Sequence, residues 1–357
     1  MEAAPEEKLL EVEGLSKVFR VRRGLVSTPF AAVDGVSFSL SAERHEILTL
    51  AGESGSGKTT LARMILGLIP PTSGRLLFRG RDVTRLSDAE RRTWFRREVQ
   101  AVFQDPYATF NPLRRVESYL YETAVNFQVA RRAEADEPIE RALNAVGLSL
   151  KEVRGRYPSE LSGGQLQRIA IARALITGPS LLVADEPVSM LDASLRMAIV
   201  NLFRELKGRQ SLIYITHDLA TAYYASDRVA IMLRGWIVEL GPVEKVLGNP
   251  LHPYTRLLRS AILEPDPSRR RERMAAAVPP DAREPLGVGC RFVHRCPLAM
   301  EICRRAVPPD VLSDGRLVRC HLYRGEAGDG RSEQGAAAIP GWAGQPEAGA
   351  PDPTGPH

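Results

Sequence analysis

The sequence lacks any apolar run long enough to cross a membrane. Its uninterrupted apolar stretches, such as 181–184 and 212–215, are far shorter than the roughly 18 residues that a membrane-spanning helix requires. The first ten residues carry acids and a proline, where a signal peptide would have a basic start and an apolar stretch. We therefore expect a chain that stays in the cytosol and does not cross a bilayer by itself.

A strong excess of charge of one sign is also missing. The formal net charge over 357 residues is +5, and part of it comes from arginine clusters at 91–97 and 269–273. Such clusters are most often solvated helix faces or linkers; the alternative is that they bind an anionic membrane surface or an acidic partner. The mild net charge does not indicate a nucleic-acid-binding protein. With 44% apolar and 25% charged residues, the chain has room for one large domain and a smaller appendage.

β-rich runs alternate with helical stretches from residue 8 to about 262, which is the pattern of a mostly parallel sheet wrapped by helices. Because ligands bind beyond the carboxyl ends of such strands, we expect the polar groups there to converge on one pocket. A mainly helical subdomain is predicted at about 106–180, and a hairpin around Arg234 and Gly235. The predicted strands are 45–50, 99–103, 181–184, 212–216, 229–233 and 236–240.

The composition changes past this first domain, which we place at 1–262. Residues 263–324 are rich in Pro and Arg and hold all four cysteines, so they are predicted to form a small Cys-rich module. Residues 325–357 consist mainly of Gly, Ala, Pro and Glu with little apolar bulk, and we expect them to be a disordered tail.

A phosphate-binding loop is predicted at 52–59, where the sequence reads GESGSGKT between a predicted strand and a predicted helix. Glycines let backbone N–H groups turn toward phosphate oxygens, and the following helix presents the positive end of its dipole. These flanks make a merely flexible glycine loop the weaker interpretation. Lys58 would reach the β- and γ-phosphates, and Thr59 would bind magnesium. The predicted nucleotide-binding residues here are Gly52, Ser54, Gly55, Ser56, Gly57, Lys58, Thr59 and Thr60.

Two acids, Asp185 and Glu186, follow the apolar run 181–184, and Pro187 stops the strand. Asp185 suits the magnesium shell, whereas Glu186 is placed to orient or deprotonate an attacking water. A pair of surface acids after a strand is the alternative, and the phosphate loop makes it the minor one.

A second anion-binding helix start is predicted at 161–165, which reads LSGGQ. A serine N-cap and two glycines open a helix whose apolar positions run from Leu166 to Leu175. One nucleotide has only one γ-phosphate, and the first loop already cradles it. The second helix start therefore indicates another nucleotide or another subunit.

The motifs together resemble the ABC transporter ATPase family. The resemblance implies an α/β fold of the P-loop NTPase class and ABC ATPase type, with the helical subdomain and the Cys-rich module as additions. It also implies a head-to-tail dimer in which Ser162, Gly164 and Gln165 of one subunit close over ATP bound at Lys58 of the other, with Asp192 contacting the opposing subunit. The matching segments within 8–262 are 52–59, Gln104, 161–165, 185–186, 189–192 and His217.

The resemblance also assigns roles to single residues. Gln104 would sense the magnesium bound by Thr59 and Asp185 as well as the attacking water, and would relay closure to the membrane partner. His217 would hold the γ-phosphate; a lone histidine after a strand is more often a core or cap residue, but its neighbours and the upstream motifs reverse that expectation here. Phe19 would stack on adenine, and on its own a Phe filling the core is about as common. The predicted catalytic residues are Lys58, Gln104, Glu186 and His217.

Three segments are similar to the oligopeptide and dipeptide importer branch of the family: 32–37, 102–107 and 249–255. The resemblance implies an ATP-hydrolysing subunit on the cytoplasmic face of the membrane that drives uptake of peptides. Its partners would be a sister ATPase, two membrane permeases and an external solute-binding protein. The branch also includes importers of nickel and glutathione, and ABC ATPases of phosphonate-degrading or DNA-repair complexes remain alternatives.

The cysteines at 290, 296, 303 and 320 suggest a shared ligand, since disulfides are disfavoured in a reducing cytosol. Four thiolates can hold zinc or an iron-sulfur cluster, and the spacing lacks the paired C-x-x-C that is typical of zinc ribbons. Similarity to the importer branch favours [4Fe-4S]. Plain thiols in a small core are the alternative.

Overall fold

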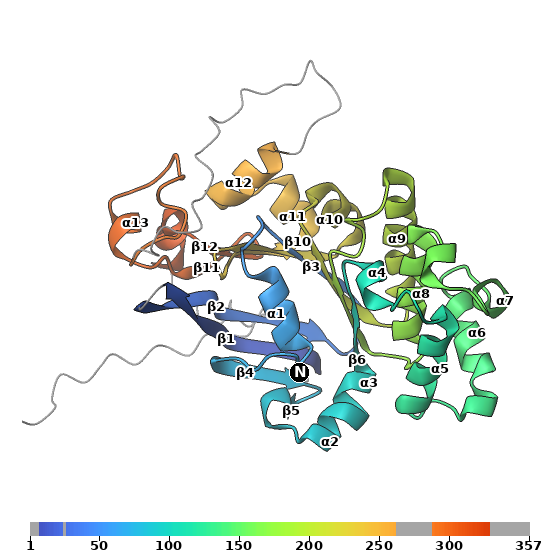
Figure 1. Ribbon diagram of the computed structural model, residues 1–357. Coiled ribbons are helices and arrows are strands. Elements are labelled where there is room, and N and C mark those ends of the chain that lie inside the picture. The colour runs from blue at the N-terminus through green and yellow to red at the C-terminus, as the bar shows by residue number, and fades with distance from the viewer. Residues whose placement is uncertain (1–6, 24–25, 262–287, 329–357) are drawn as a thin grey trace, which may run out of the picture.

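A computed structural model describes residues 7–23, 26–261 and 288–328 of the chain. The strands form two sheets, helices lie on both sides of them, and a helical region lies at one end (Figure 1). The predicted tail at 325–357 lies outside the described residues from 329 onward.

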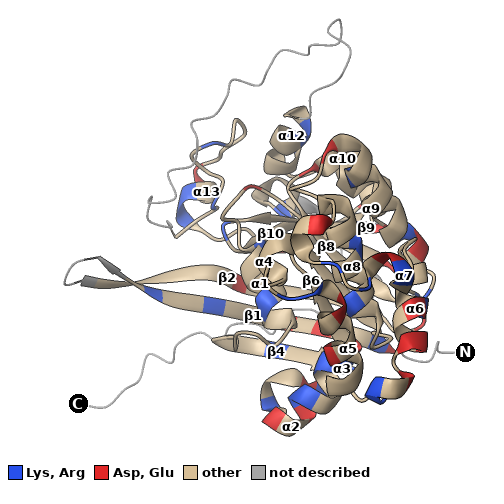
Figure 2. Ribbon diagram, turned by 45° about the vertical axis from the view of Figure 1, so that its right-hand side comes forward, with Lys and Arg blue, Asp and Glu red and all other residues tan. Residues whose placement is uncertain are grey.

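The first sheet is antiparallel, in contrast to the mostly parallel arrangement predicted from residue 8 onward. Its strand order is β2-β1-β4-β5. The outer halves of β1 and β2 project beyond the rest of the protein as a two-stranded ribbon (Figure 2). Leu10 and Phe38 are buried at the base of the pair, whereas Phe19 and Phe30 are exposed farther out. The strands are β1 (Lys8–Arg23), β2 (Val26–Ser41), β4 (Ser73–Phe78) and β5 (Arg81–Asp82).

The second sheet has eight strands in the order β11-β12-β10-β9-β3-β8-β7-β6. The five strands from β9 to β6 are parallel to one another, and every residue of β3 and β8 is buried, as expected for parallel strands covered on both faces. All six predicted strands are confirmed, with shifts of one or two residues at their ends. These six are β3 (Ile47–Ala51), β6 (Val99–Val102), β7 (Leu181–Asp185), β8 (Ser211–Thr216), β9 (Arg228–Leu233) and β10 (Trp236–Pro242). The sheet also contains β11 (Asp310–Ser313) and β12 (Arg316–Arg319), which were not predicted.

The predicted hairpin around Arg234 and Gly235 is present between β9 and β10. Both residues have positive φ, 46° and 91°, which is what the tight turn of a two-residue hairpin requires. On the other side of β10, β12 pairs with it in an antiparallel register that sets Glu239 opposite Val318. The C-terminal region therefore extends the main sheet through its own two strands.

Helices surround the sheets, and the segment from α4 (Pro106–Thr109) to α8 (Gly163–Leu175) consists of helices and connecting loops, with no strand. This segment packs around buried apolar side chains such as Leu120, Ile139 and Ile169. The α-helices are α1 (Lys58–Ile65), α2 (Asp88–Glu90), α3 (Arg96–Glu98), α4 (Pro106–Thr109), α5 (Val116–Asn126), α6 (Asp136–Asn144), α7 (Leu150–Val153), α8 (Gly163–Leu175), α9 (Ala193–Leu206), α10 (Leu219–Ala225), α11 (Val243–Gly248), α12 (Pro253–Ser260) and α13 (Ile302–Arg305).

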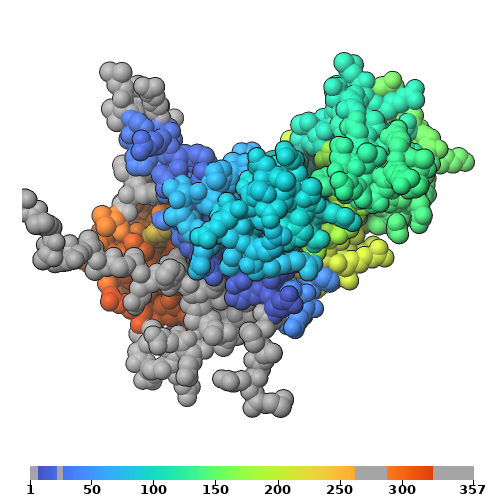
Figure 3. Space-filling view, turned by 90° about the horizontal axis from the view of Figure 1, so that it is seen from below, coloured from blue at the N-terminus to red at the C-terminus, as the bar shows by residue number. Residues whose placement is uncertain are grey.

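Short helical turns complete the structure: η1 (Val83–Arg85), η2 (Arg91–Phe95), η3 (Arg132–Glu134), η4 (Pro158–Glu160) and η6 (His321–Gly328). In the space-filling view the helical region, green, stands at one end of the molecule and the C-terminal region, orange to red, at the other (Figure 3). None of the helices in the described part of the chain has the length and apolar character needed to span a bilayer.

Candidate nucleotide site

The loop from Gly52 to Lys58 joins β3 to α1 in a shape that only glycine permits at two positions. Gly52 and Gly57 have φ of 146° and 107°. A Cβ on Gly52 would lie 2.2 Å from the carbonyl oxygen of Met232, and one on Gly57 would lie 2.3 Å from that of Ala32. The close approach of neighbouring backbone thus explains two of the predicted loop glycines, in addition to any contact with phosphate.

Lys58 begins α1 with its side chain folded back into the loop. It is 5% exposed, and Nζ donates hydrogen bonds to the carbonyl oxygens of Gly52 at 2.8 Å and Glu53 at 2.9 Å. Burial lowers the pKa of Lys58, and the nearby carboxylates of Glu186 and Asp185 act in the opposite direction. A buried ammonium group at a helix start is well placed to bind an anion.

Thr59 and Asp185 form a pair of oxygen donors beside the loop. The Thr59 hydroxyl donates to Oδ1 of Asp185 at 3.3 Å, which brings the start of α1 to the end of β7. Burial raises the pKa of Asp185, partly offset by this hydrogen bond. A hydroxyl and a carboxylate oxygen this close together fit a magnesium ion, which prefers such ligands.

Three further polar side chains meet at the ends of β6, β7 and β8. Oε2 of Glu186 lies 3.2 Å from Nδ1 of His217 and 3.4 Å from Nε2 of Gln104. Glu186 has a φ of 46°, although it is not glycine, and its N–H donates to the Ile215 carbonyl at 3.0 Å. Such a backbone conformation costs about 1–3 kcal/mol and is concentrated at functional sites. The predicted convergence of polar groups at strand ends is therefore present.

The second predicted helix start has the expected local structure. Ser162 caps α8 by accepting a hydrogen bond from the Gln165 N–H at 3.2 Å, and the Gln165 side chain accepts one from the Ser162 N–H at 3.0 Å. Gly164 faces Leu195, whose Cδ1 would be 3.0 Å from an added Cβ. Within the described chain, Ser162 and Gln165 bond each other and not the phosphate loop. A single chain therefore does not unite the two motifs.

Asp192 and Phe19 occupy positions outside the polar cluster. Asp192 caps α9, where its Oδ1 accepts from the Leu195 N–H at 3.0 Å. The Phe19 ring lies on β1, is 38% exposed and has Nζ of Lys17 at 5.4 Å from its centroid. Because the ring is not enclosed, Phe19 does not serve to fill the core.

The four cysteines, which are all free thiols, lie around one small cavity in the C-terminal region. Burial raises the pKa of Cys290 and of Cys320 to about 11. Across the described residues, no three His, Cys, Asp or Glu side chains are grouped closely enough to hold a metal ion. The predicted cluster or zinc site is therefore not supported by the arrangement of the thiols.

One set of contacts to the phosphate loop had no signal in the sequence. Arg295 forms two hydrogen bonds with the carboxylate of Glu53, and the Tyr254 hydroxyl accepts a hydrogen bond from the Glu53 N–H. Glu53 and Arg295 are 242 residues apart, and neither belongs to a spacing pattern that would have linked them.

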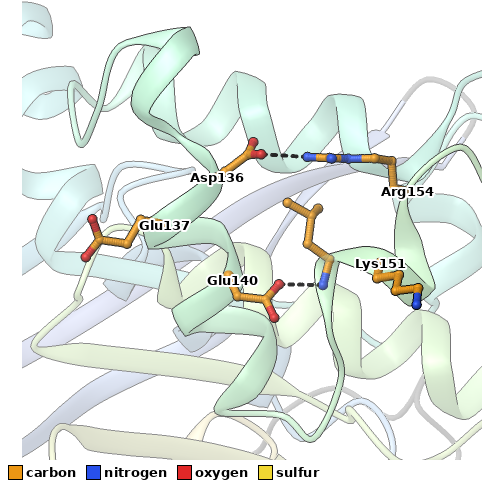
Figure 4. Close-up of a pocket in the computed structure, with 6 residues that line it drawn as sticks. Asp136, Glu137, Glu140, Lys151 and Arg154 are labelled. Carbon is orange, nitrogen blue, oxygen red and sulfur yellow. Dashed lines mark hydrogen bonds and ion pairs between the residues drawn. The ribbon is translucent and has the colours of Figure 1, made fainter.

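A cavity of about 580 Å³ lies away from these groups, between α6 and α7 (Figure 4). Three of its charged side chains already have partners: Arg154 pairs with Asp136 at 2.7 Å, and Glu140 accepts from the Leu150 N–H at 2.6 Å. The polar cluster at the strand ends, and not this cavity, is the candidate site.

Comparison with known proteins gives two family matches. Residues 33–189 match the family described as ABC transporter. Residues 238–303 match the family described as the oligopeptide/dipeptide transporter C-terminal region.

Alignments with related proteins span most of this chain. A probable peptide ABC transporter ATP-binding protein of Sinorhizobium fredii is 44% identical over 88% of this chain and 90% of its own length. The oligopeptide transport ATP-binding protein AppF of Bacillus subtilis is 41% identical over 90% of this chain and 100% of its own. A di/tripeptide transport ATP-binding protein of Pseudomonas aeruginosa is 41% identical over 88% and 98%.

Two solved structures share the fold. One is a component of an ABC transporter complex from Clostridium perfringens, with a TM-score of 0.59 and 27% identity over 68% of this chain and 92% of that one. The other is an ATP-binding cassette solved as a dimer in a post-hydrolysis state with ADP and Pi, with a TM-score of 0.56 and 26% identity over 66% and 98%.

Proposed function

Because this chain belongs to the ABC transporter family and is an ATPase of that type, we propose that it is the motor subunit of an importer that takes up peptides. The observation that carries the proposal is the meeting of Lys58, Thr59, Gln104, Asp185, Glu186 and His217 at the carboxyl ends of neighbouring strands. Relatives whose names refer to peptide transport, at 41–44% identity, support the cargo.

The side chains of the cluster divide the work of ATP hydrolysis among them. Lys58, now bonded to the carbonyls of Gly52 and Glu53, turns to the β- and γ-phosphates when ATP enters. Thr59 and Asp185 would hold magnesium, which would neutralise phosphate charge. Glu186 orients the water whose oxygen bonds to the γ-phosphorus while the bond to the bridging oxygen of ADP breaks.

The neighbours of Glu186 give it a fixed direction. His217 and Gln104 both contact its Oε2, so the carboxylate is held from two strands while its own backbone is fixed in the left-handed region. His217 would bind the γ-phosphate, and Gln104 would sense magnesium and the attacking water. This rigidity lowers the reorganisation needed at the moment of reaction.

The Ser162 helix start acts on a second subunit. Its N-cap leaves further N–H groups of the first turn of α8 able to bind an anion, and the phosphate loop of the same chain does not use them. Two chains arranged head to tail place Ser162, Gly164 and Gln165 of one over ATP bound at Lys58 of the other. Asp192 contacts the opposing subunit, and Phe19 stacks on the adenine ring.

Closure of such a dimer drives transport only if membrane subunits change conformation with it. The proposed assembly contains a sister ATPase, two permease subunits and an external solute-binding protein, with this chain on the cytoplasmic face. The match of residues 238–303 to the oligopeptide/dipeptide transporter C-terminal region supports that setting.

The test uses the Glu186→Gln and Lys58→Ala variants in the reconstituted transporter. Glu186→Gln keeps the phosphate contacts and should bind ATP normally, lower kcat about 10²- to 10⁴-fold and accumulate ATP-bound dimers. Lys58→Ala should lose ATP binding. Peptide uptake into vesicles should fall with both variants. Unchanged turnover in Glu186→Gln, or no co-purification with multi-span membrane proteins, would refute the proposal.

A ligand shared by the four cysteines belongs to the same proposal. The side chains of Cys290, Cys296, Cys303 and Cys320 line one cavity but are not grouped as a metal site. After burial, the charges of Cys303 and Cys296 also raise the pKa of Cys290, and the charges of the other three cysteines raise that of Cys320. A tetrathiolate ligand, [4Fe-4S] or zinc, would require the thiols to approach one another further. Iron, sulfide and zinc analysis of anaerobically purified protein decides the matter, and stoichiometries near zero for all three would leave plain thiols.

A further inference from the structure

The C-terminal region contacts the phosphate loop directly through Arg295. Its Nη1 and Nη2 donate to the two carboxylate oxygens of Glu53 at 2.9 and 2.7 Å. The side chains are only 15% and 28% exposed, so water screens the pair weakly. A bidentate arginine–carboxylate contact of this kind fixes the relative orientation of the two side chains and also balances their charges.

The backbone of Glu53 is held from the same side. Its N–H donates to the hydroxyl of Tyr254 at 3.0 Å, and Tyr254 is fully buried on α12. The Tyr254 ring packs edge-on against Phe292 at 5.4 Å between centroids, three residues before Arg295. Both anchors of Glu53 therefore belong to one packed unit at the C-terminal end of the described chain.

Glu53 is also bonded to the functional lysine. Its carbonyl oxygen accepts from Nζ of Lys58 at 2.9 Å and from the Ser56 N–H at 3.2 Å. The carboxylate of Glu53 is close enough to Lys58 to influence its pKa. Without its partner, this carboxylate would add an unbalanced negative charge next to the place where phosphates bind.

We propose that Arg295 is a positioning residue for the phosphate loop: it balances the charge of Glu53 and fixes the loop, so that the C-terminal region sets the affinity for ATP. The inference rests on the proposed nucleotide site. It assigns the appended region a part in nucleotide binding, although Arg295 does not touch the nucleotide.

The experiment measures the dissociation constant of MgATP for the purified full-length chain. Arg295→Ala should weaken ATP binding about 5- to 30-fold, because the freed carboxylate repels phosphate and attracts Lys58. In the transporter, its KM for ATP should rise by the same factor while kcat at saturating ATP changes less than about twofold. Arg295→Lys keeps the charge with fewer hydrogen bonds and should recover part of the affinity.

A double-mutant cycle separates this role from a general loss of structure. In a Glu53→Ala background, Arg295→Ala should change ATP affinity less than about twofold, because the repelling carboxylate is gone. A structural defect would instead persist in that background. The matched control is Arg305→Ala, which breaks the exposed pair of Arg305 with Glu301 in the same region and should leave affinity unchanged.

Each outcome has one meaning. A full loss of affinity in Arg295→Ala that persists with Glu53→Ala, or wild-type affinity in Arg295→Ala, overturns the inference. Lys58→Ala distinguishes this failure from failure of the proposed function. If Lys58→Ala still binds ATP tightly, the nucleotide site itself is wrong; if it does not, only the role of Arg295 is rejected.

Discussion

Replacing Arg316 with Met should loosen the attachment of β12 to β10. The Arg316 guanidinium is 1% exposed, donates to the carbonyls of Lys245 and Asn249 at 2.6 Å each, and lies 3.5 Å from Oε1 of Glu239. Glu239 is fully buried, and burial raises its pKa. Removing one partner of a buried ion pair costs about 3–5 kcal/mol, because the remaining buried charge loses its counter-charge.

The loss can be measured locally by hydrogen exchange with mass spectrometry. A cost of about 3–5 kcal/mol corresponds to exchange of β10 and β12 amides that is faster by roughly two to three and a half orders of magnitude, up to the limit set by global unfolding. Adding Glu239→Gln should recover part of it, since a neutral amide oxygen can still accept from the N–H groups of Leu251 and His252. Acceleration of less than about tenfold in Arg316→Met would refute the reasoning.

Three other predictions concern the nucleotide site. Gly57→Ala should lower the melting temperature more than Gly55→Ala, because its Cβ would lie 2.3 Å from the Ala32 carbonyl whereas Gly55 has open space around it; equal shifts would contradict this. Lys58→Met should raise the melting temperature of the nucleotide-free protein at pH 7, because burial lowers the pKa of this lysine and so disfavours folding with the charged form. That gain should shrink as pH rises from the lowered folded pKa toward the ordinary value of 10.5, and a gain that grew with pH would have the wrong sign. Phe19→Ala should weaken ATP binding several-fold, by about 0.5–1.5 kcal/mol, without changing the melting temperature, since its ring is 38% exposed; unchanged affinity measured by titration would reject adenine stacking.

The strands that carry the site were predictable because their apolar runs are short, continuous and bounded by turn residues. The runs at 181–184 and 212–215 are fully buried in β7 and β8, and the acids and the histidine that follow them meet at one edge of the sheet. This convergence could be predicted from the sequence because ligands bind beyond the carboxyl ends of parallel strands. The helix cap at Ser162 was likewise local, since it depends on residues three positions apart.

The antiparallel sheet was not predicted, because both of its long strands combine exposed and buried stretches. The ribbon that projects beyond the core exposes four apolar residues, Val18, Phe19, Val21 and Phe30. An apolar residue in these strands is therefore not necessarily a buried one. The left-handed backbone of Glu186 was also not predicted from the sequence, and the hydrogen bond of its N–H joins it to a different strand, β8.

By itself the sequence determined the phosphate loop, the strand-end acids and the second helix start, since each depends on neighbouring residues and on the periodicity of one element. The tertiary structure alone decided that β12 would extend the main sheet beside β10, and that Arg295 would reach Glu53 in the phosphate loop. Those contacts join segments far apart in the chain, and their geometry is set by how the packed elements fit together, which no local pattern encodes.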